Sequence, residues 1–132
     1  MDEEIACDTT LLIDLQRPVR TSTGLGAREF LQRYARSRFY ISAIVFGEFA
    51  AGLADERDPV LVETRRRFAP LPLDDQVALV YRVIFRELRA SGKLIGANDL
   101  WIAATAVRHG FPLVTSNHGE FSRIRQLRVL RY

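Results

Sequence analysis

Short apolar runs alternate with longer amphipathic stretches along the chain. The runs cover residues 5–7, 39–41, 71–73, 113–115 and 127–130, and their length and their β-branched and aromatic content indicate buried strands. Between them, residues 26–38, 43–53, 59–68, 75–91 and 99–109 carry apolar positions at helical spacing. Strands that alternate with helices predict an α/β fold, a three-layer α/β/α sandwich whose central, mainly parallel sheet has about five strands.

Polar residues and turn formers mark the expected helix ends. Asp58-Pro59 is typical of a helix start, and we expect Ser42, Asp74 and Asn98 to cap the helices that follow them. Residues 9–24 are expected to form a turn-and-loop region, because threonines, a proline and a glycine interrupt the helical spacing there.

The composition is that of one ordinary globular domain. With 132 residues, 48% of them hydrophobic, the chain can bury a core without a disulfide or metal. No linker or repeat interrupts it, so we expect residues 1–132 to form a single domain. Residues 1–4 are acidic, unlike the start of a secretory signal, and no apolar stretch approaches the ~20 residues of a membrane helix. The lone cysteine, Cys7, fits a reduced, cytoplasmic location.

The basic residues are nearly all arginines. Nineteen basic residues against 16 acidic ones give a net charge of +3, and Lys93 is the one lysine. Guanidinium groups bind phosphate in a bidentate way, which suits a nucleic-acid partner. A net charge this small does not establish one, and an arginine-biased genome would explain the composition equally well.

Four carboxylates fall where neither a pure core nor a pure surface would place them. Asp8 closes the first apolar run, and Glu48 is the one charged residue of the stretch 43–50. Asp99 begins an apolar stretch, and Glu120 follows the fourth run. Because strand ends and the helix starts beside them share one edge of a parallel sheet, we expect these four groups to converge.

Converging carboxylates repel one another and lose hydration when they are partly buried. A hard divalent cation relieves both costs, and Mg²⁺ binds carboxylate oxygens while it keeps several waters. Such a site can activate water against a phosphodiester. Each acid also has an ordinary explanation: Asp8 could cap a turn, Asp99 could favour a helix dipole, and Glu48 could pair with an arginine.

Four segments, in order, resemble one known family. They are Asp-Thr-Thr at 8–10, ISAIVFGE at 41–48, GKLIGANDLWIAA at 92–104 and LVTSN at 113–117. Together they are similar to the PIN-domain ribonucleases, and among these to the VapC toxins of bacterial type II toxin–antitoxin modules. The resemblance runs from about residue 5 to the end of the chain.

The resemblance implies a Mg²⁺-dependent endoribonuclease, with Mn²⁺ as a possible substitute, that hydrolyses RNA by metal-activated water. It also implies a homodimer that a cognate VapB-type antitoxin holds inactive. Asp8, Glu48 and Asp99 match the family's three principal acidic positions, with Asp8 and Asp99 as the metal ligands. Glu120 is expected to be the fourth catalytic acid.

Two positions depart from the family pattern. Thr10 stands where an asparagine or serine is common, and its hydroxyl can still bond locally. Asn117 is neutral where an aspartate often stands, so it adds no charge. Thr9, Thr115 and Asn117 are expected to position water or phosphate. The neutral Asn117 keeps an alternative open, a catalytically degenerate PIN-like protein that binds RNA or a partner without cleaving.

Overall fold

A computed structural model describes residues 3–132, so residues 1 and 2, which begin the acidic segment 1–4, lie outside the described residues. Strands and helices alternate along most of the chain, as the apolar pattern predicts. In chain order they are β1 (Glu4–Cys7), α1 (Thr9–Leu15), α2 (Ser22–Arg33), β2 (Arg38–Ser42), α3 (Ala43–Ala50), α4 (Pro59–Arg67), β3 (Ala69–Leu71), α5 (Asp75–Ala90), α6 (Ala97–His109), β4 (Leu113–Val114), α7 (His118–Phe121) and β5 (Val129–Leu130).

The five strands form one parallel sheet in the order β3-β2-β1-β4-β5, which confirms the predicted sheet. The chain moves outward from β1 to β2 and β3, and later returns to the other side of β1. Ligands of such sheets bind outside the carboxyl ends of the strands where the order reverses, here between β1 and β4. Ala6 pairs with Leu113 and Cys7 with Val114, so Asp8 and Thr115 leave the sheet side by side.

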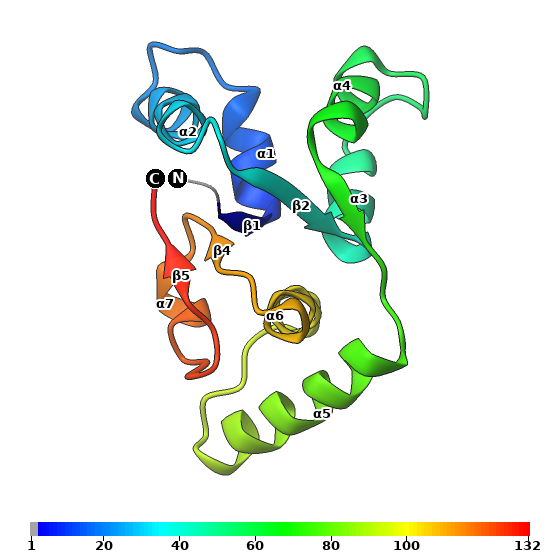
Figure 1. Ribbon diagram of the computed structural model, residues 1–132, viewed down its shortest axis with the longest axis vertical. Coiled ribbons are helices and arrows are strands. Elements are labelled where there is room, and N and C mark those ends of the chain that lie inside the picture. Colours follow the sequence, from blue (N-terminus) through cyan, green and yellow to red (C-terminus); the bar gives the residue numbers. More distant parts are fainter. Residues whose placement is uncertain (1–2) are drawn as a thin grey trace.

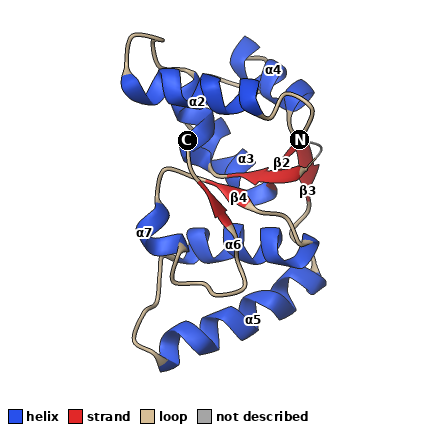
Figure 2. Cartoon of the chain, turned by 60° about the vertical axis from the view of Figure 1, so that its left-hand side comes forward, coloured by secondary structure: helices blue, strands red, loops and turns tan. Residues whose placement is uncertain are grey.

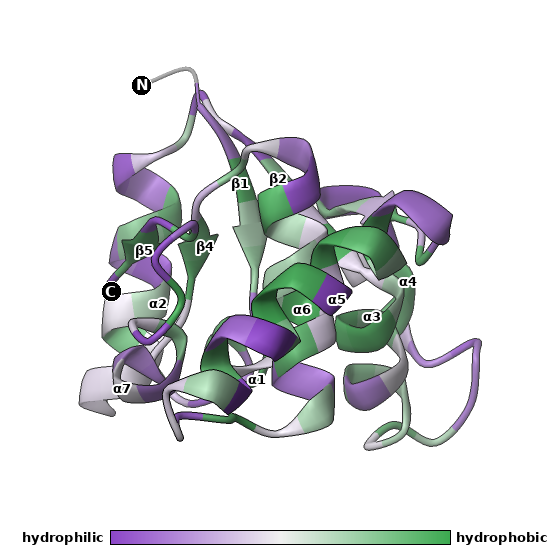
Figure 3. Cartoon of the chain, turned by 90° about the horizontal axis from the view of Figure 1, so that it is seen from below, coloured by the Kyte–Doolittle hydropathy of each residue, from purple (hydrophilic) through white to green (hydrophobic). Residues whose placement is uncertain are grey.

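Helices cover both faces of the sheet. Helices α1 and α2, with α4 beside them, lie on one side, while α6 lies on the other and α5 packs on the outside of α6 (Figures 1 and 2). Hydrophobic residues occupy most of α6 (Figure 3). Ala103, Ala104 and Ala106 of α6 are fully buried, and their small side chains let the helix approach the sheet closely.

Several predicted helix ends are confirmed. Ser42, Asp58 and Asp74 each accept a backbone N–H of the first turn that follows. Gly110 ends α6 with φ of +71°, a left-handed conformation that side-chain-bearing residues rarely adopt. The predicted cap at Asn98 is wrong, because Gly96 is the residue before α6 and Asn98 lies within the first turn.

The predicted loop over residues 9–24 is wrong, because α1 occupies Thr9–Leu15 and α2 already begins at Ser22. Asp8 is the N-cap residue of α1. Thr21 is the N-cap residue of α2, and its hydroxyl oxygen accepts the N–H of Gly24 at 3.1 Å. Two consecutive threonines, which have low helix propensity, obscure the start of α1 in the sequence. Burial of Leu11 and Leu12 on the sheet outweighs that propensity.

Smaller differences concern boundaries. Helix α2 ends at Arg33 rather than at 38, α3 ends at Ala50 rather than at 53, and β3 lies at 69–71 rather than at 71–73. The short helix α7 was not predicted, because four residues are too few for a periodic pattern. Within residues 3–132, no helix is both long and apolar enough to span a membrane.

Candidate active site

Asp8 is almost fully buried at the end of β1, with 4% of its surface exposed. Its Oδ1 accepts the backbone N–H of Thr9 at 2.8 Å, so it caps α1. Its Oδ2 accepts the hydroxyl of Thr115 at 2.6 Å and that of Thr10 at 3.3 Å. A carboxylate offers about four lone-pair positions, so one on Oδ1 remains for a cation. The capping role that the structure shows is therefore compatible with the predicted role of Asp8 as a metal ligand.

Glu48 lies on α3 and is exposed at the mouth of the site. Its Oε1 accepts the hydroxyl of Thr9 at 2.7 Å, and its Oε2 accepts the side-chain amide of Asn98 at 3.3 Å. Among the described residues Glu48 forms no ion pair, so its expected alternative partner, an arginine, is not there. These bonds join the start of α1, helix α3 and the start of α6.

Asp99 and Glu120 complete the group. Asp99 is half-buried in the first turn of α6, and Glu120 is partly buried on α7. Burial, the negative charge of Asp8, and the hydrogen bond and charge of Glu120 raise the pKa of Asp99 to about 6, with a smaller contribution from Glu48. The other three carboxylates thus lie close enough to Asp99 to oppose its ionisation.

Burial also raises the pKa of Asp8, and Glu48 adds to the rise. The bonds from Thr115, Thr9 and Thr10 act in the opposite direction, because they stabilise the ionised form. Burial and the neighbouring Glu48 disfavour the ionised form of Asp8 while the hydroxyl groups favour it, so a cation bound to this carboxylate would relieve the cost of its charge.

The donor set fits a hard divalent cation. All four groups offer carboxylate oxygens, which suit Mg²⁺ or Mn²⁺ better than they suit metals that prefer sulfur or nitrogen. In residues 3–132, no three Asp, Glu, His or Cys side chains are already gathered as a metal cage. Mg²⁺ does not need one, since it keeps most of its waters and takes one or two carboxylates directly.

The predicted water- or phosphate-positioning residues bond to the carboxylates or to each other. Thr9 donates to Glu48 and the fully buried Thr115 donates to Asp8. Asn117 donates its backbone N–H to Thr115 Oγ1 at 2.9 Å and lies just before α7. Thr9 and Thr115 therefore act on the acids themselves, and their role toward water or phosphate stays a prediction.

Asn98 was not predicted as a site residue, although it adjoins Asp99. The sequence predicts a helix cap at this position, the usual role of asparagine before an apolar stretch. Its amide instead reaches Glu48 from the first turn of α6. The one available signal was its place at the same sheet edge as the four acids.

Three arginines near the end of the chain have partners within the protein. Arg125 pairs with Glu87 at 3.0 Å, and Arg128 pairs with Glu3 at 2.7 Å. Arg123 donates to the carbonyl of Leu94 at 3.2 Å, in the loop that leads to Asp99 and α6. Of these three contacts, the Arg123 bond reaches the loop before Asp99, while Arg128 and Glu3 pair at the opposite ends of the strands.

Known proteins share both the sequence and the fold of this chain. The family model of the PIN domain matches residues 5–127. Ribonuclease VapC1 of Rickettsia felis is 32% identical over 135 residues, which cover 93% of this chain and 92% of that protein.

Two solved structures are similar over nearly the whole chain. The structure of VapBC2 from Rickettsia felis bound to a DNA fragment from its promoter has a TM-score of 0.80 and 25% identity, and covers 98% of both chains. That of DNA-bound VapBC from Salmonella typhimurium has a TM-score of 0.77 and 30% identity, and covers 99% of this chain and 98% of that one. With the family match over most of its length, this chain belongs to the PIN-domain family, in its VapC ribonuclease branch.

Proposed function

We propose that this protein is a metal-dependent endoribonuclease and the toxin of a type II toxin–antitoxin pair. The observation that carries the proposal is the convergence of four carboxylates where the strand order reverses, with the pKa of Asp99 raised to about 6 by burial and by its acidic neighbours. The names of the relatives support the ribonuclease activity.

Asp8 and Asp99 would hold the cation. When bound, Mg²⁺ or Mn²⁺ would activate water and neutralise charge on the scissile phosphate. Thr115 and Thr10 favour the ionised form of Asp8 and fix its Oδ2, while Thr9 and Asn98 hold Glu48 at the mouth of the site. In the proposal, Glu48 and Glu120 orient the attacking water or hold a second ion.

The test incubates purified, antitoxin-free protein with structured and unstructured RNAs in Mg²⁺, Mn²⁺ or EDTA. We expect cleavage at a few discrete positions with either metal and none in EDTA. Calorimetric titration with Mn²⁺ in the absence of RNA runs in parallel. Binding of Mn²⁺ without cleavage would mean that the RNA set lacks the target. A protein that neither binds Mn²⁺ nor cleaves would instead be the degenerate PIN-like binding protein.

Thr115→Val tests the support of Asp8. The substitution keeps the shape of the side chain but removes the 2.6 Å bond to a buried carboxylate. We expect roughly tenfold slower cleavage, and about 1–3 kcal/mol lower free energy of unfolding, measured by urea denaturation. Thr105→Val is the matched control, since Thr105 is equally buried but bonds to the carbonyl of Trp101. Slowed cleavage in both variants would contradict a specific role for Thr115.

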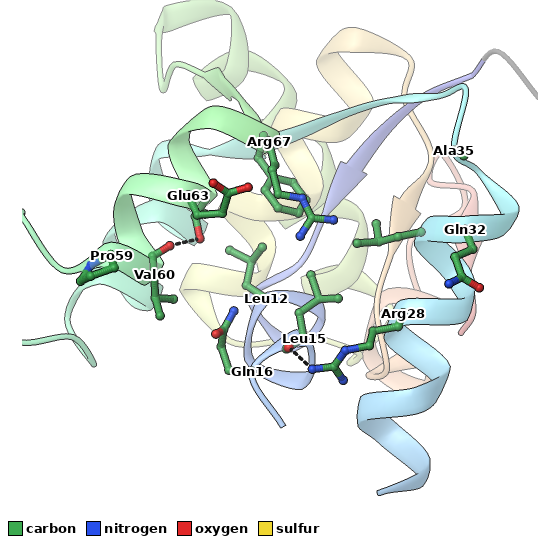
Figure 4. A pocket seen from close by; sticks show the side chains of 13 residues that line it. Leu12, Leu15, Gln16, Arg28, Gln32, Ala35, Pro59, Val60, Glu63 and Arg67 are labelled. Atoms are coloured by element: carbon green, nitrogen blue, oxygen red, sulfur yellow. Dashed lines mark hydrogen bonds between the residues drawn. The ribbon is translucent and has the colours of Figure 1, made fainter. Parts of the chain in front are cut away.

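The proposed partner is an antitoxin, as the solved complexes of relatives suggest. The surface that we propose for it is a groove of 680 Å³ between α1, α2 and α4 (Figure 4). Leucine and valine side chains form its floor, and charged groups of Arg28, Glu63 and Arg67 stand at its rim. Such a groove suits the apolar face of an amphipathic helix.

Ala35→Trp tests this surface. Ala35 lines the groove and is exposed, so a larger side chain would obstruct the groove without disturbing the core. We expect at least tenfold weaker binding of the cognate antitoxin, measured by calorimetry, with RNA cleavage unchanged. Ala90→Trp, at the exposed end of α5, is the control. Equal affinity of the two variants would exclude the groove.

We also propose that the protein is a homodimer. An apolar cavity of 550 Å³ lies between the start of α3 and β3, and Phe46 and Leu71 are among the residues that line it. Leu73, just beyond β3, is 44% exposed. Phe49, which follows on the same helix, is buried in the core and does not contribute to this surface. The apolar surface left beside β3 suits a second copy of this chain.

A further inference from the structure

Arginines gather at the amino ends of the strands, at the sheet edge opposite the carboxylate site. Arg38 is the first residue of β2 and pairs in register with Glu4, the first residue of β1, whereas Asp8 follows the other end of β1. Helix α4 is followed by β3, so the last turn of α4 lies at the same edge as Arg38. Arg38 and the three arginines of that turn, residues 65–67, are exposed and line a hollow of 520 Å³.

Little negative charge opposes these arginines. Arg66 pairs with Glu63 at 3.2 Å, while Arg38, Arg65 and Arg67 form an ion pair with no acid of residues 3–132. The carboxyl end of a helix carries only about half a negative charge, which is too little to offset three arginines in its last turn. The hollow therefore has an excess of positive charge.

The acids at the start of β1 are bound to other groups. Glu3 accepts a hydrogen bond from Arg128 at 2.7 Å, and Glu4 accepts one from the hydroxyl of Tyr40 at 2.9 Å. They lie near the first turn of β2 along the same edge, but neither forms an ion pair with the arginines of the hollow.

Aromatic rings support two of the guanidinium groups. Cζ of Arg65 lies 5.2 Å from the ring centre of Phe46, and Cζ of Arg67 lies 6.0 Å from that of Phe68. An aromatic ring under a guanidinium group limits its motion without using its N–H donors, which stay available for a carboxylate or a phosphate.

The hollow continues the groove that we propose for the antitoxin. Arg67 and Phe68 line both, and Ala35, which lines the groove, is two residues before Ser37, which lines the hollow (Figure 4). A polypeptide that leaves the groove at this end would pass over the arginines. RNA at the carboxylates would instead bind at the opposite edge of the sheet. The position of the arginines therefore favours the antitoxin as their partner.

We propose that Arg38 and residues 65–67, the arginine surface, bind an acidic segment of the antitoxin that adjoins the helix in the groove. Guanidinium groups bind carboxylates through two parallel N–H bonds. Because the surface is exposed, its charges chiefly speed association and make it dependent on salt, and they contribute less to the lifetime of the complex. The inference rests on the proposed toxin function and specifies the chemistry of its partner.

Arg38→Gln/Arg66→Gln tests the arginine surface. It spares Arg67, which also lines the groove, and Arg65, which also lines the apolar cavity beside β3. We expect association with the cognate antitoxin, measured by stopped-flow fluorescence, to slow roughly tenfold at about 50 mM NaCl and less than about twofold at about 500 mM. The dissociation rate should change less than about threefold.

Arg82→Gln/Arg89→Gln is the matched control. Both arginines are exposed on α5, which lies beyond α6 on the other side of the sheet from α4 (Figure 2). The control therefore makes the same change in net charge away from the arginine surface. Equal association rates and equal salt dependence of the two double variants would overturn the proposal.

The antitoxin provides an independent test. A cognate antitoxin without a cluster of acidic residues beside its toxin-binding helix would overturn the proposal. Where the cluster is present, replacing its carboxylates by amides should slow association as much as Arg38→Gln/Arg66→Gln does, and combining both changes should have little further effect. Independent, multiplicative losses would show that the two groups do not contact each other.

RNA is the alternative partner of the arginine surface. Fluorescence anisotropy of a labelled single-stranded RNA of about 20 nucleotides, in EDTA to prevent cleavage, measures its binding. If Arg38→Gln/Arg66→Gln weakens RNA binding while antitoxin association matches that of the control, the surface binds RNA and the proposal is refuted.

The outcomes also separate this inference from the proposed function. If the unaltered protein does not bind the antitoxin, the proposed partner fails and this inference fails with it. If Ala35→Trp weakens antitoxin binding but Arg38→Gln/Arg66→Gln behaves like its control, the groove stands and only the acidic segment is refuted. Slower, less salt-dependent association of Arg38→Gln/Arg66→Gln alone would support the arginine surface.

Discussion

Asp99→Asn is expected to reduce RNA cleavage by about 10³-fold or more, which corresponds to roughly 4 kcal/mol of lost transition-state stabilisation. The substitution keeps the size and hydrogen-bonding shape of the side chain but removes one of the two carboxylates proposed to hold the cation. Discontinuous assays at saturating Mg²⁺ would measure the residual rate. Glu29→Gln, an equal change of charge at an exposed position of α2, should leave the rate unchanged.

The reason for so large an effect is electrostatic. Asp8, Glu48 and Glu120 all oppose the ionisation of Asp99, so the site accumulates negative charge that a bound cation relieves when Asp99 is ionised. An amide at position 99 removes this need and one of the proposed ligands at once. Cleavage by Asp99→Asn within tenfold of the natural rate, in the presence of metal, would show that the reaction does not depend on this acid.

The strands and the acids could be predicted from the sequence because each rests on a local pattern. A short apolar run that ends in an acid, as at Asp8, predicts both a buried strand and its edge. Glu48 and Asp99 stand out as single charges in apolar stretches. The parallel alternation then brings them to one edge, and the raised pKa of Asp99 bears out their convergence.

The groups that support the acids could not be predicted in the same way. Thr115 and Asp8 are 107 positions apart, and Thr9 and Glu48 are 39 apart, so no spacing rule relates them. Helix α1 was missed because local propensity disfavours it and only burial against the sheet stabilises it. Partner choice among hydroxyl and amide groups depends on the tertiary structure, which brings these elements together.

The metal-free protein should also lose stability as the pH rises. The pKa of Asp99 is about 6 in the folded protein against 3.8 in the unfolded chain, so the folded state holds its proton more tightly. This contribution is full below pH 4, and it is lost as the pH rises through 6. Solvent screening reduces it to about 1 kcal/mol, because Asp99 is only half-buried. In EDTA, Asp99→Asn should therefore gain stability relative to the natural protein between pH 4 and 7.

Mn²⁺ should reverse this order at pH 7. A cation that binds only the folded state stabilises by about 2.7 kcal/mol at a hundred times its Kd, or roughly 10 °C in Tm for a chain of this size. Asp99→Asn should gain far less, so the natural protein becomes the more stable one when Mn²⁺ is present and the less stable one in EDTA. Thermal unfolding of both proteins under both conditions measures the crossing. Equal increases in Tm on addition of Mn²⁺ would mean that the cation binds elsewhere. The repulsion among the carboxylates destabilises the metal-free site, and the same repulsion favours binding of a cation there, so replacing Asp99 has to reduce the increase if this is the metal site.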